Sequence, residues 1–235
     1  MARITRKELK ADKFALEVEH TVTFFEEHQQ DLLRYGGVVV VAAALIGGFL
    51  VYRQHQHAAR EAALGRAIQV QETAVGAPAQ GSATASMFPN QQVKDEAAIK
   101  VFTDLKSKYS GSAEAEIAAY YLGAIQSGQG KLAEAEKSFQ DVAANGDERY
   151  APLAKLSLAD VYFAEGKVDQ AQKVLEDLAA HPTLFVSKEQ AQIALARGLI
   201  PVKPAEARKI LDPLRITPGA AGQVALQLYG QLPPQ

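Results

Sequence analysis

A pattern of fifteen residues recurs in this chain at an interval of 36 residues. The segment GKLAEAEKSFQDVAA at 130–144 aligns with GKVDQAQKVLEDLAA at 166–180, and a further shift of 36 reaches VKPAEARKILDPLRI at 202–216. Each copy has a small residue followed four and seven positions later by large apolar residues, which is the spacing of one helical face. A period of this length predicts stacked helical units. The aligned columns are Ala135/Ala171/Ala207, Phe139/Leu175/Leu211 and Val142/Leu178/Leu214.

Each of these predicted helices follows another helical segment. AEIAAYYLGAIQSGQG precedes the first copy, and APLAKLSLADVYFAEG precedes the second. Gly130 and Gly166 stand between the paired segments, where a glycine readily forms the turn. Before the third copy, EQAQIALARGLIPVKP has Pro201 and Pro204 in place of the turn glycine. The sequence therefore predicts helical hairpins.

The flanking segments extend the same pattern in both directions. KDEAAIKVFTDLKSKY at 94–109 repeats the small-large-large spacing, and its predicted partner is the helical stem at 53–74. Between them, 75–92 is rich in Gly, Pro, Ser and Ala and is predicted to be a flexible loop. AAGQVALQLYGQL at 220–232 is predicted to be a capping helix. We expect a repeat domain over 93–235 with about three to four hairpins.

The stretch from Tyr35 to Tyr52 has 18 residues and no charged side chain. As a helix it would measure about 27 Å, close to the ~30 Å of a bilayer's hydrocarbon core. A cleaved signal peptide does not fit, because 34 residues precede the stretch and Tyr-Arg-Gln-His follows it. A buried core helix would need equally apolar segments around it, and the chain has none. An uncleaved membrane span is therefore the favoured interpretation.

Small residues four apart within this stretch could allow a second membrane helix to approach closely. The alternative is that small residues are simply common in membrane helices. These candidate packing positions are Ala43 with Gly47 and Ala44 with Gly48.

The charge pattern leaves the orientation of the span open. Residues 15–34 carry only Arg34 as a cation, whereas 53–72 carry three arginines, and the far N-terminus adds further lysines and arginines. The segment 1–34 could be an amphipathic helix on the membrane surface or a disordered lead into a helical stem. The net charge of −2 gives no bias toward nucleic acid.

No arrangement of side chains in the sequence indicates catalysis, a metal site or a cofactor. Cysteine is absent, and His55 and His57 are two residues apart, so on a helix they diverge. The segment SGQGK at 127–131 lacks the spacing of a phosphate-binding loop. The neighbouring acidic residues fit solvated helix faces or loops better than a shared catalytic cleft; they are Glu134/Glu136, Asp147/Glu148 and Glu176/Asp177. We therefore predict neither an enzyme nor a small-molecule substrate.

A stack of hairpins offers a groove lined by the first helix of each pair. Such a groove could hold an extended peptide or a helix of a partner protein. In the alternative interpretation, the aromatic side chains of Tyr120 and Phe163 pack within the stack instead. The candidates are Tyr120, Ala124, Asp160, Phe163, Gln192 and Ala196.

These repeats resemble the tetratricopeptide repeat, whose pattern combines Leu-Gly, a tyrosine and Ala-x-x-x-Phe. The first unit matches at Leu122, Gly123, Ala135 and Phe139. The second matches at Leu158, Tyr162 and Ala171, and the third, 188–219, keeps mainly Ala207 and Leu211. The tryptophan of the family pattern is missing. The resemblance implies an α-solenoid. Together with the predicted span, the expected fold is all-α: a single N-terminal transmembrane helix followed by a tetratricopeptide-like α-solenoid.

The order of a polar N-terminus, one span, a stem and divergent repeats resembles the ancillary subunit of the bacterial Sec translocon. TFFEEHQQDLLRYGG, which leads into the span, carries part of this resemblance. The resemblance implies a single-pass inner-membrane protein with a cytoplasmic N-terminus and periplasmic repeats. It further implies contact with the translocon and with periplasmic chaperones of exported proteins. A scaffold for envelope assembly or cell division is the main alternative, and an envelope enzyme is a further one.

Overall fold

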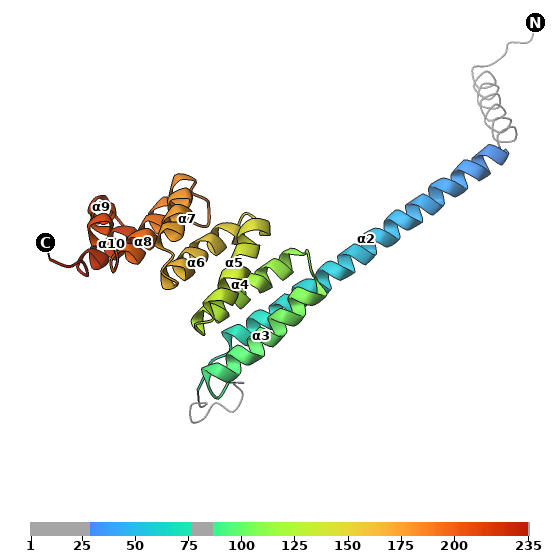
Figure 1. Ribbon diagram of the computed structural model, residues 1–235. Coiled ribbons are helices and arrows are strands. Elements are labelled where there is room, and N and C mark those ends of the chain that lie inside the picture. The colour runs from blue at the N-terminus through green and yellow to red at the C-terminus, as the bar shows by residue number, and fades with distance from the viewer. Residues whose placement is uncertain (1–28, 77–86, 235) are drawn as a thin grey trace, which may run out of the picture. The chain divides into compact units, whose positions relative to one another are not determined.

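The computed structural model describes residues 29–76 and 87–234, and these residues form a succession of α-helices (Figure 1). The chain divides into two compact units, one ending at Ala58 and the other beginning at Ala59. Helix α2, Gln29–Glu72, is continuous and includes the predicted span together with most of the predicted stem. Most of the predicted segment 1–34 and the centre of the predicted loop 75–92 lie outside the described residues.

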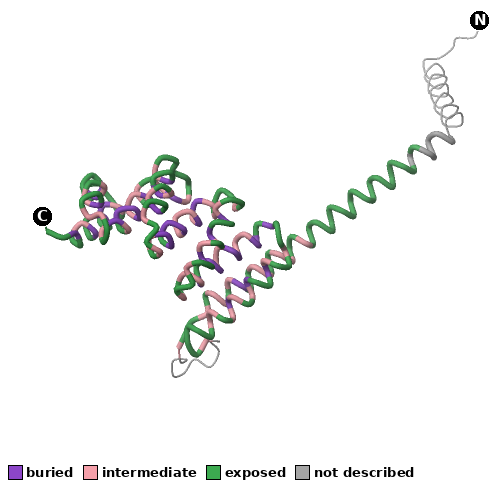
Figure 2. Tube along the Cα trace, in the orientation of Figure 1, coloured by how far each residue is buried: buried purple, intermediate pink, exposed green. Residues whose placement is uncertain are grey.

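The apolar part of α2 has no covering partner among the described residues. The region between Gly37 and Glu72 is the one described helix that is long and apolar enough to cross a membrane, and its apolar window is entirely exposed (Figure 2). Leu45 and Phe49 are 70% and 61% exposed. Large contiguous apolar surfaces are rare in contact with water. The exposed apolar surface of this helix is consistent with the predicted membrane span and does not fit a covered core helix among the described residues.

The second unit contains the end of α2 and eight further described helices. They are α3 Gln91–Lys108, α4 Ala113–Gly128, α5 Leu132–Asn145, α6 Tyr150–Ala164, α7 Val168–Ala180, α8 Lys188–Leu199, α9 Pro204–Leu214 and α10 Ala220–Tyr229. Helices α5, α7 and α9 begin at residues 132, 168 and 204, so the 36-residue period of the sequence is the period of these helices. The predicted all-α architecture of stacked hairpins is confirmed.

The helices contact one another in a regular order. Each helix from α3 to α10 packs against the next one, and α4, α6, α8 and α10 also contact each other in succession. We call α4, α6, α8 and α10 the first helices, because three of them open a hairpin and α10 continues their row. Helices α3, α5, α7 and α9 are the second helices. This is the nearest-neighbour packing of a solenoid.

The predicted small-large-large columns form the core of the stack. All nine of their side chains in α5, α7 and α9 are buried, and so are Ala98, Phe102 and Leu105 at the same spacing in α3. The small residues allow close approach of paired helices. A Cβ at Gly123 of α4 would lie 2.9 Å from the ring of Phe139 in α5. Ala67 at the end of α2 packs into the α3–α4 part of the core.

The hairpin turns require glycine at two equivalent positions. Gly130 and Gly166 have φ angles of +73° and +76°, in the left-handed region that disfavours other residues. We expect Gly166→Ala to lower the free energy of unfolding by about 1 kcal/mol. Gly128→Ala is the matched control, because Gly128 ends α4 with open space around its Cβ. In chemical denaturation followed by circular dichroism, a Gly166→Ala chain as stable as the wild type would contradict this turn.

The hairpin formed by the end of α2 and α3 is closed by backbone contacts at its tip. Val75 and Phe88 form an isolated parallel bridge. Gly76 N–H donates to the Phe88 carbonyl and Phe88 N–H donates to the Ala74 carbonyl, both at 3.0 Å. Asn90 then caps α3 by accepting from Val93 N–H at 2.9 Å. These contacts fix the two ends of the connection between α2 and α3.

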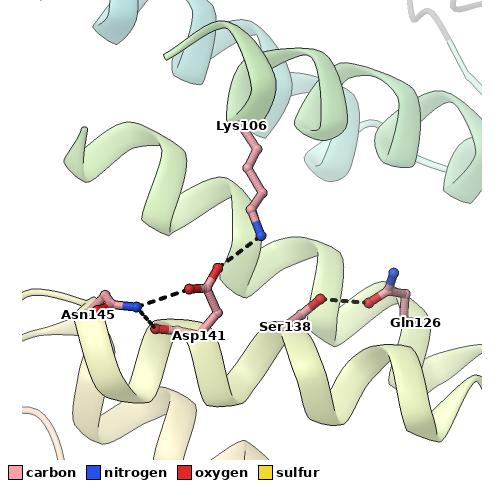
Figure 3. Close-up of polar contacts among 5 residues, drawn as sticks. All are labelled: Lys106, Gln126, Ser138, Asp141 and Asn145. Atoms are coloured by element: carbon pink, nitrogen blue, oxygen red, sulfur yellow. Dashed lines mark hydrogen bonds and ion pairs between the residues drawn. The ribbon is translucent and has the colours of Figure 1, made fainter. Parts of the chain in front are cut away.

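Polar contacts connect successive hairpins, and the helices within a hairpin, at the surface of the stack. Lys106 of α3 donates to Asp141 of α5 at 3.0 Å, while Asn145 donates to the same carboxylate (Figure 3). The hydrogen bond from Lys106 is the main reason that the pKa of Asp141 is lowered. Within the α4–α5 hairpin, Ser138 Oγ donates to Gln126 at 3.0 Å (Figure 3). Such exposed pairs contribute little stability individually, so the apolar columns carry most of the packing energy.

Candidate functional site

The row of first helices contains a pocket of about 630 Å³ over α6, α8 and α10. We call this pocket the groove. Its apolar surface comes from side chains on all three helices and on the segment before α10. These apolar residues are Leu156, Ile193, Ala194, Pro218, Ala220, Ala221 and Val224.

Polar groups line the edges of the groove. Ser187, Glu189 and Gln190 stand at the start of α8, where Ser187 and Gln190 form a reciprocal capping box. At the other end of α8, Arg197 Nη2 donates to both carboxylate oxygens of Asp160 on α6, at 2.9 and 3.2 Å. An apolar floor with a few polar groups at its edges is typical of a site that binds a peptide or a helix through apolar side chains.

Four of the predicted groove residues lie on α4 and α6. Ala124 and Asp160 are exposed, and Asp160 pairs with the groove residue Arg197. Tyr120 is half-buried, with its ring centroid 5.7 Å from that of Phe139 and 5.4 Å from that of Tyr150. Tyr120 therefore packs against neighbouring rings of the stack, and its role in partner binding stays a prediction.

Phe163 also packs inward. Its half-buried ring contacts the main core, and a Cβ at position 198 would collide with it, so Gly198 makes room for this ring on α8. Tyr120 and Phe163 thus support the first helices from within, and neither lines the groove.

The two predicted residues on α8 are displaced by one position. Ala196 is 0% exposed and presents no side chain to a ligand, and Gln192 is half-buried outside the groove lining. The groove is lined instead by Ile193 and Arg197. The prediction placed groove positions on α8 at 36 residues after those of α6. The buried positions of α6, however, recur in α8 after 37 residues. The matching buried pairs are Ala154/Ala191, Leu158/Leu195, Ala159/Ala196 and Tyr162/Leu199.

A length change on either side of α8 explains this shift. From Val142 to Ala154 the chain advances 12 residues, whereas from Leu178 to Ala191 it advances 13. After α8 the extra residue is recovered, because α8 ends at the counterpart of Tyr162 while α6 continues for two more residues. Ile200 separates the end of α8 from Pro201, which has no backbone N–H with which to continue the helical hydrogen bonds.

The small residues of α2 are exposed throughout. Ala43, Ala44, Gly47 and Gly48 have no described neighbour that covers them, and a Cβ added at either glycine meets nothing within 4 Å. Their role in packing against another membrane helix stays a prediction.

Several ionisable groups near the first helices have shifted pKa values, but none points to catalysis. Burial raises the pKa of Tyr121 and that of Tyr150, both of which lie in the aromatic cluster around Tyr120. Burial, together with Asp147, raises the pKa of Glu116 at the start of α4. Within the described part of the chain, no three His, Asp or Glu side chains are grouped closely enough to hold a metal ion.

Comparison with known families agrees with this architecture. The chain matches the model of the tetratricopeptide repeat-like domain over residues 24–192, which includes the apolar part of α2 and the helices up to the middle of α8. Comparison with curated proteins gives no match, and neither does comparison with solved structures. The match to this family model covers well over half of the chain. It agrees with the paired helices and with their buried small-large-large columns. The chain belongs to the tetratricopeptide repeat-like domain family.

Proposed function

We propose that this protein is a membrane-anchored scaffold that binds partner proteins in the groove over α6, α8 and α10. The groove is the observation that supports the proposal. The helices around it already pack their core side chains against one another, yet the apolar floor of the groove stays accessible. Tetratricopeptide-like domains generally mediate protein–protein interactions. An apolar strip bordered by an Arg–Asp pair suits a partner segment with apolar side chains.

The proposed anchor is the apolar part of α2. Its exposed side chains would be covered by lipid, and Tyr35 and Tyr52 at its two ends suit the interfaces of a bilayer. The family match extends across this part of α2 into the repeats, which supports a single functional assembly of anchor and scaffold.

For the partners, we propose the Sec translocon and periplasmic chaperones, with the N-terminus in the cytoplasm and the repeats in the periplasm. The support is the resemblance of the chain to the ancillary translocon subunit. Protease treatment of spheroplasts and of inside-out vesicles tests the orientation: digestion of residues 94–235 only in inside-out vesicles would refute it. Recovery of division or outer-membrane assembly proteins in place of translocon subunits, after gentle detergent extraction, would favour the alternative scaffold.

Two substitutions on α10 test the groove. Val224 lines the groove, whereas Leu226, on the same helix and also exposed, does not. We expect Val224→Asp to reduce co-purification of translocon subunits at least tenfold, because a partner's apolar side chain would then meet a charge. Leu226→Asp should leave recovery unchanged. Equal recovery with both variants, at unchanged helical content, would show that partners do not use the groove.

A further inference from the structure

The loop between α7 and α8 is longer than its counterpart and contains an ordered turn. It covers seven residues, 181–187, whereas the loop between α5 and α6 covers four, 146–149. Thr183 Oγ1 accepts from the N–H groups of Phe185 and Val186, at 3.3 and 3.0 Å, and Thr183 N–H donates to the Val186 carbonyl at 2.9 Å. Val186 is fully buried. The loop therefore has a defined conformation rather than a loose one.

This constrained loop holds a leucine in solvent. Leu184 is 92% exposed, the highest exposure among the described large apolar residues. The next residue, Phe185, is half-buried, with the Arg149 guanidinium 5.6 Å from its ring centroid. A single exposed leucine needs no explanation by itself. A leucine presented on a fixed turn is different, because little further ordering is needed when a partner covers it.

A pocket of about 440 Å³ lies directly beside Leu184. Leu184 and Phe185 form one side of it, and its apolar surface continues over Ala143, Ala151, Pro152 and Leu178 of α5, α6 and α7. A protruding leucine and a pocket that could receive one thus lie next to each other on one surface. This is the arrangement of a self-complementary patch, in which two copies related by a two-fold axis each supply both parts.

The charges around the pocket also fit a second copy. Lys155 Nζ lies 3.3 Å from the carboxylate of Asp177, and Glu148, His181 and Thr183 complete the polar part of the lining. Because both signs occur in one small patch, a two-fold related copy can place its Lys155 near an acidic group and its acidic groups near Lys155. A patch of one sign would repel its own copy.

We propose that a second copy of this chain docks here, with Leu184 of each copy inserted into the pocket of the other. The inference rests on the proposed membrane anchoring, because confinement to one bilayer raises the effective concentration of the copies. A contact that is smaller than the interface of a stable soluble dimer can then suffice. The groove over α6, α8 and α10 is lined by other residues, so dimerisation leaves it open to partners.

Introduced cysteines test this contact, because the chain has no cysteine of its own. Two differently tagged full-length chains, one Leu184→Cys and the other Ala151→Cys, are co-expressed and their membranes mildly oxidised. We expect a mixed-chain disulfide at least ten times more abundant than in the control pair, Ile216→Cys with Ala151→Cys. Ile216 is a suitable control, since it is apolar, 79% exposed and outside the pocket lining.

Equal cross-linking of the two pairs would overturn the proposal. So would a photoreactive side chain at position 184 that captures a different protein instead of a second copy. A separate portion of the same membranes, not oxidised, is washed with carbonate. Chains that are released disprove the anchor, whereas chains that are retained without a mixed disulfide disprove the dimer alone.

Discussion

A chain with aspartate in place of both Val41 and Leu45 should no longer remain in the membrane. Each charge near the centre of a spanning helix costs about 2.5–3.5 kcal/mol, so the pair costs roughly 5–7 kcal/mol. That energy corresponds to a change of roughly 4 × 10³- to 10⁵-fold in partitioning. Both side chains are exposed on α2, so the repeats of the second unit should keep their fold. Carbonate extraction followed by immunoblotting of the pellet and supernatant measures the release.

The matched control places the same two charges on the second unit. Val202 and Ile216 are exposed apolar residues of the repeats, and their replacement by aspartate should leave the chain in the pellet. If the Val41/Leu45 variant also stayed in the pellet, the exposed apolar surface of α2 would need another explanation, such as a stable protein partner.

Phe139→Ala should lower the free energy of unfolding by about 3–5 kcal/mol, the usual cost of removing a buried aromatic ring. Phe139 is 2% exposed and packs against Gly123 and the ring of Tyr120, both on α4. Neighbouring helices cannot close such a cavity without moving the α4–α5 hairpin. Urea denaturation of the purified full-length chain, followed by circular dichroism at 222 nm, gives the difference.

Phe185→Ala is the comparison for this loss. Its ring lies half-buried in the loop before α8, so we expect a cost of no more than about 1.5 kcal/mol, from partial burial and the Arg149 contact. Similar losses for the two variants would mean that the small-large-large columns do not dominate stability.

The sequence was sufficient for the second helices because their pattern depends on helical spacing alone. Phe139 and Val142 lie four and seven residues after Ala135, and each of the three has a buried counterpart 36 residues later. The turn glycines were equally readable, because a left-handed turn leaves few other choices of residue.

The groove was only partly predictable, because it depends on how three helices face one another. The shift of α8 follows from compensating length changes around it, and these leave the overall period unaltered. Val224 lies in a segment whose sequence indicated only a cap. Leu184 lies among Phe185 and Val186 in an apolar run, and only the turn formed by Thr183 shows that it points away from the core.

The order of helix contacts has a consequence for how the chain folds. From α3 to α10, helices touch only partners that are adjacent or next but one in the described chain, so short loops must close before each packing contact forms. Low contact order favours rapid folding. Each hairpin can therefore consolidate as soon as its second helix emerges, while the residues behind it are still an extended thread. A chain that emerges N-terminus first, from a ribosome or through a narrow pore, would therefore begin to fold before its last residues have emerged.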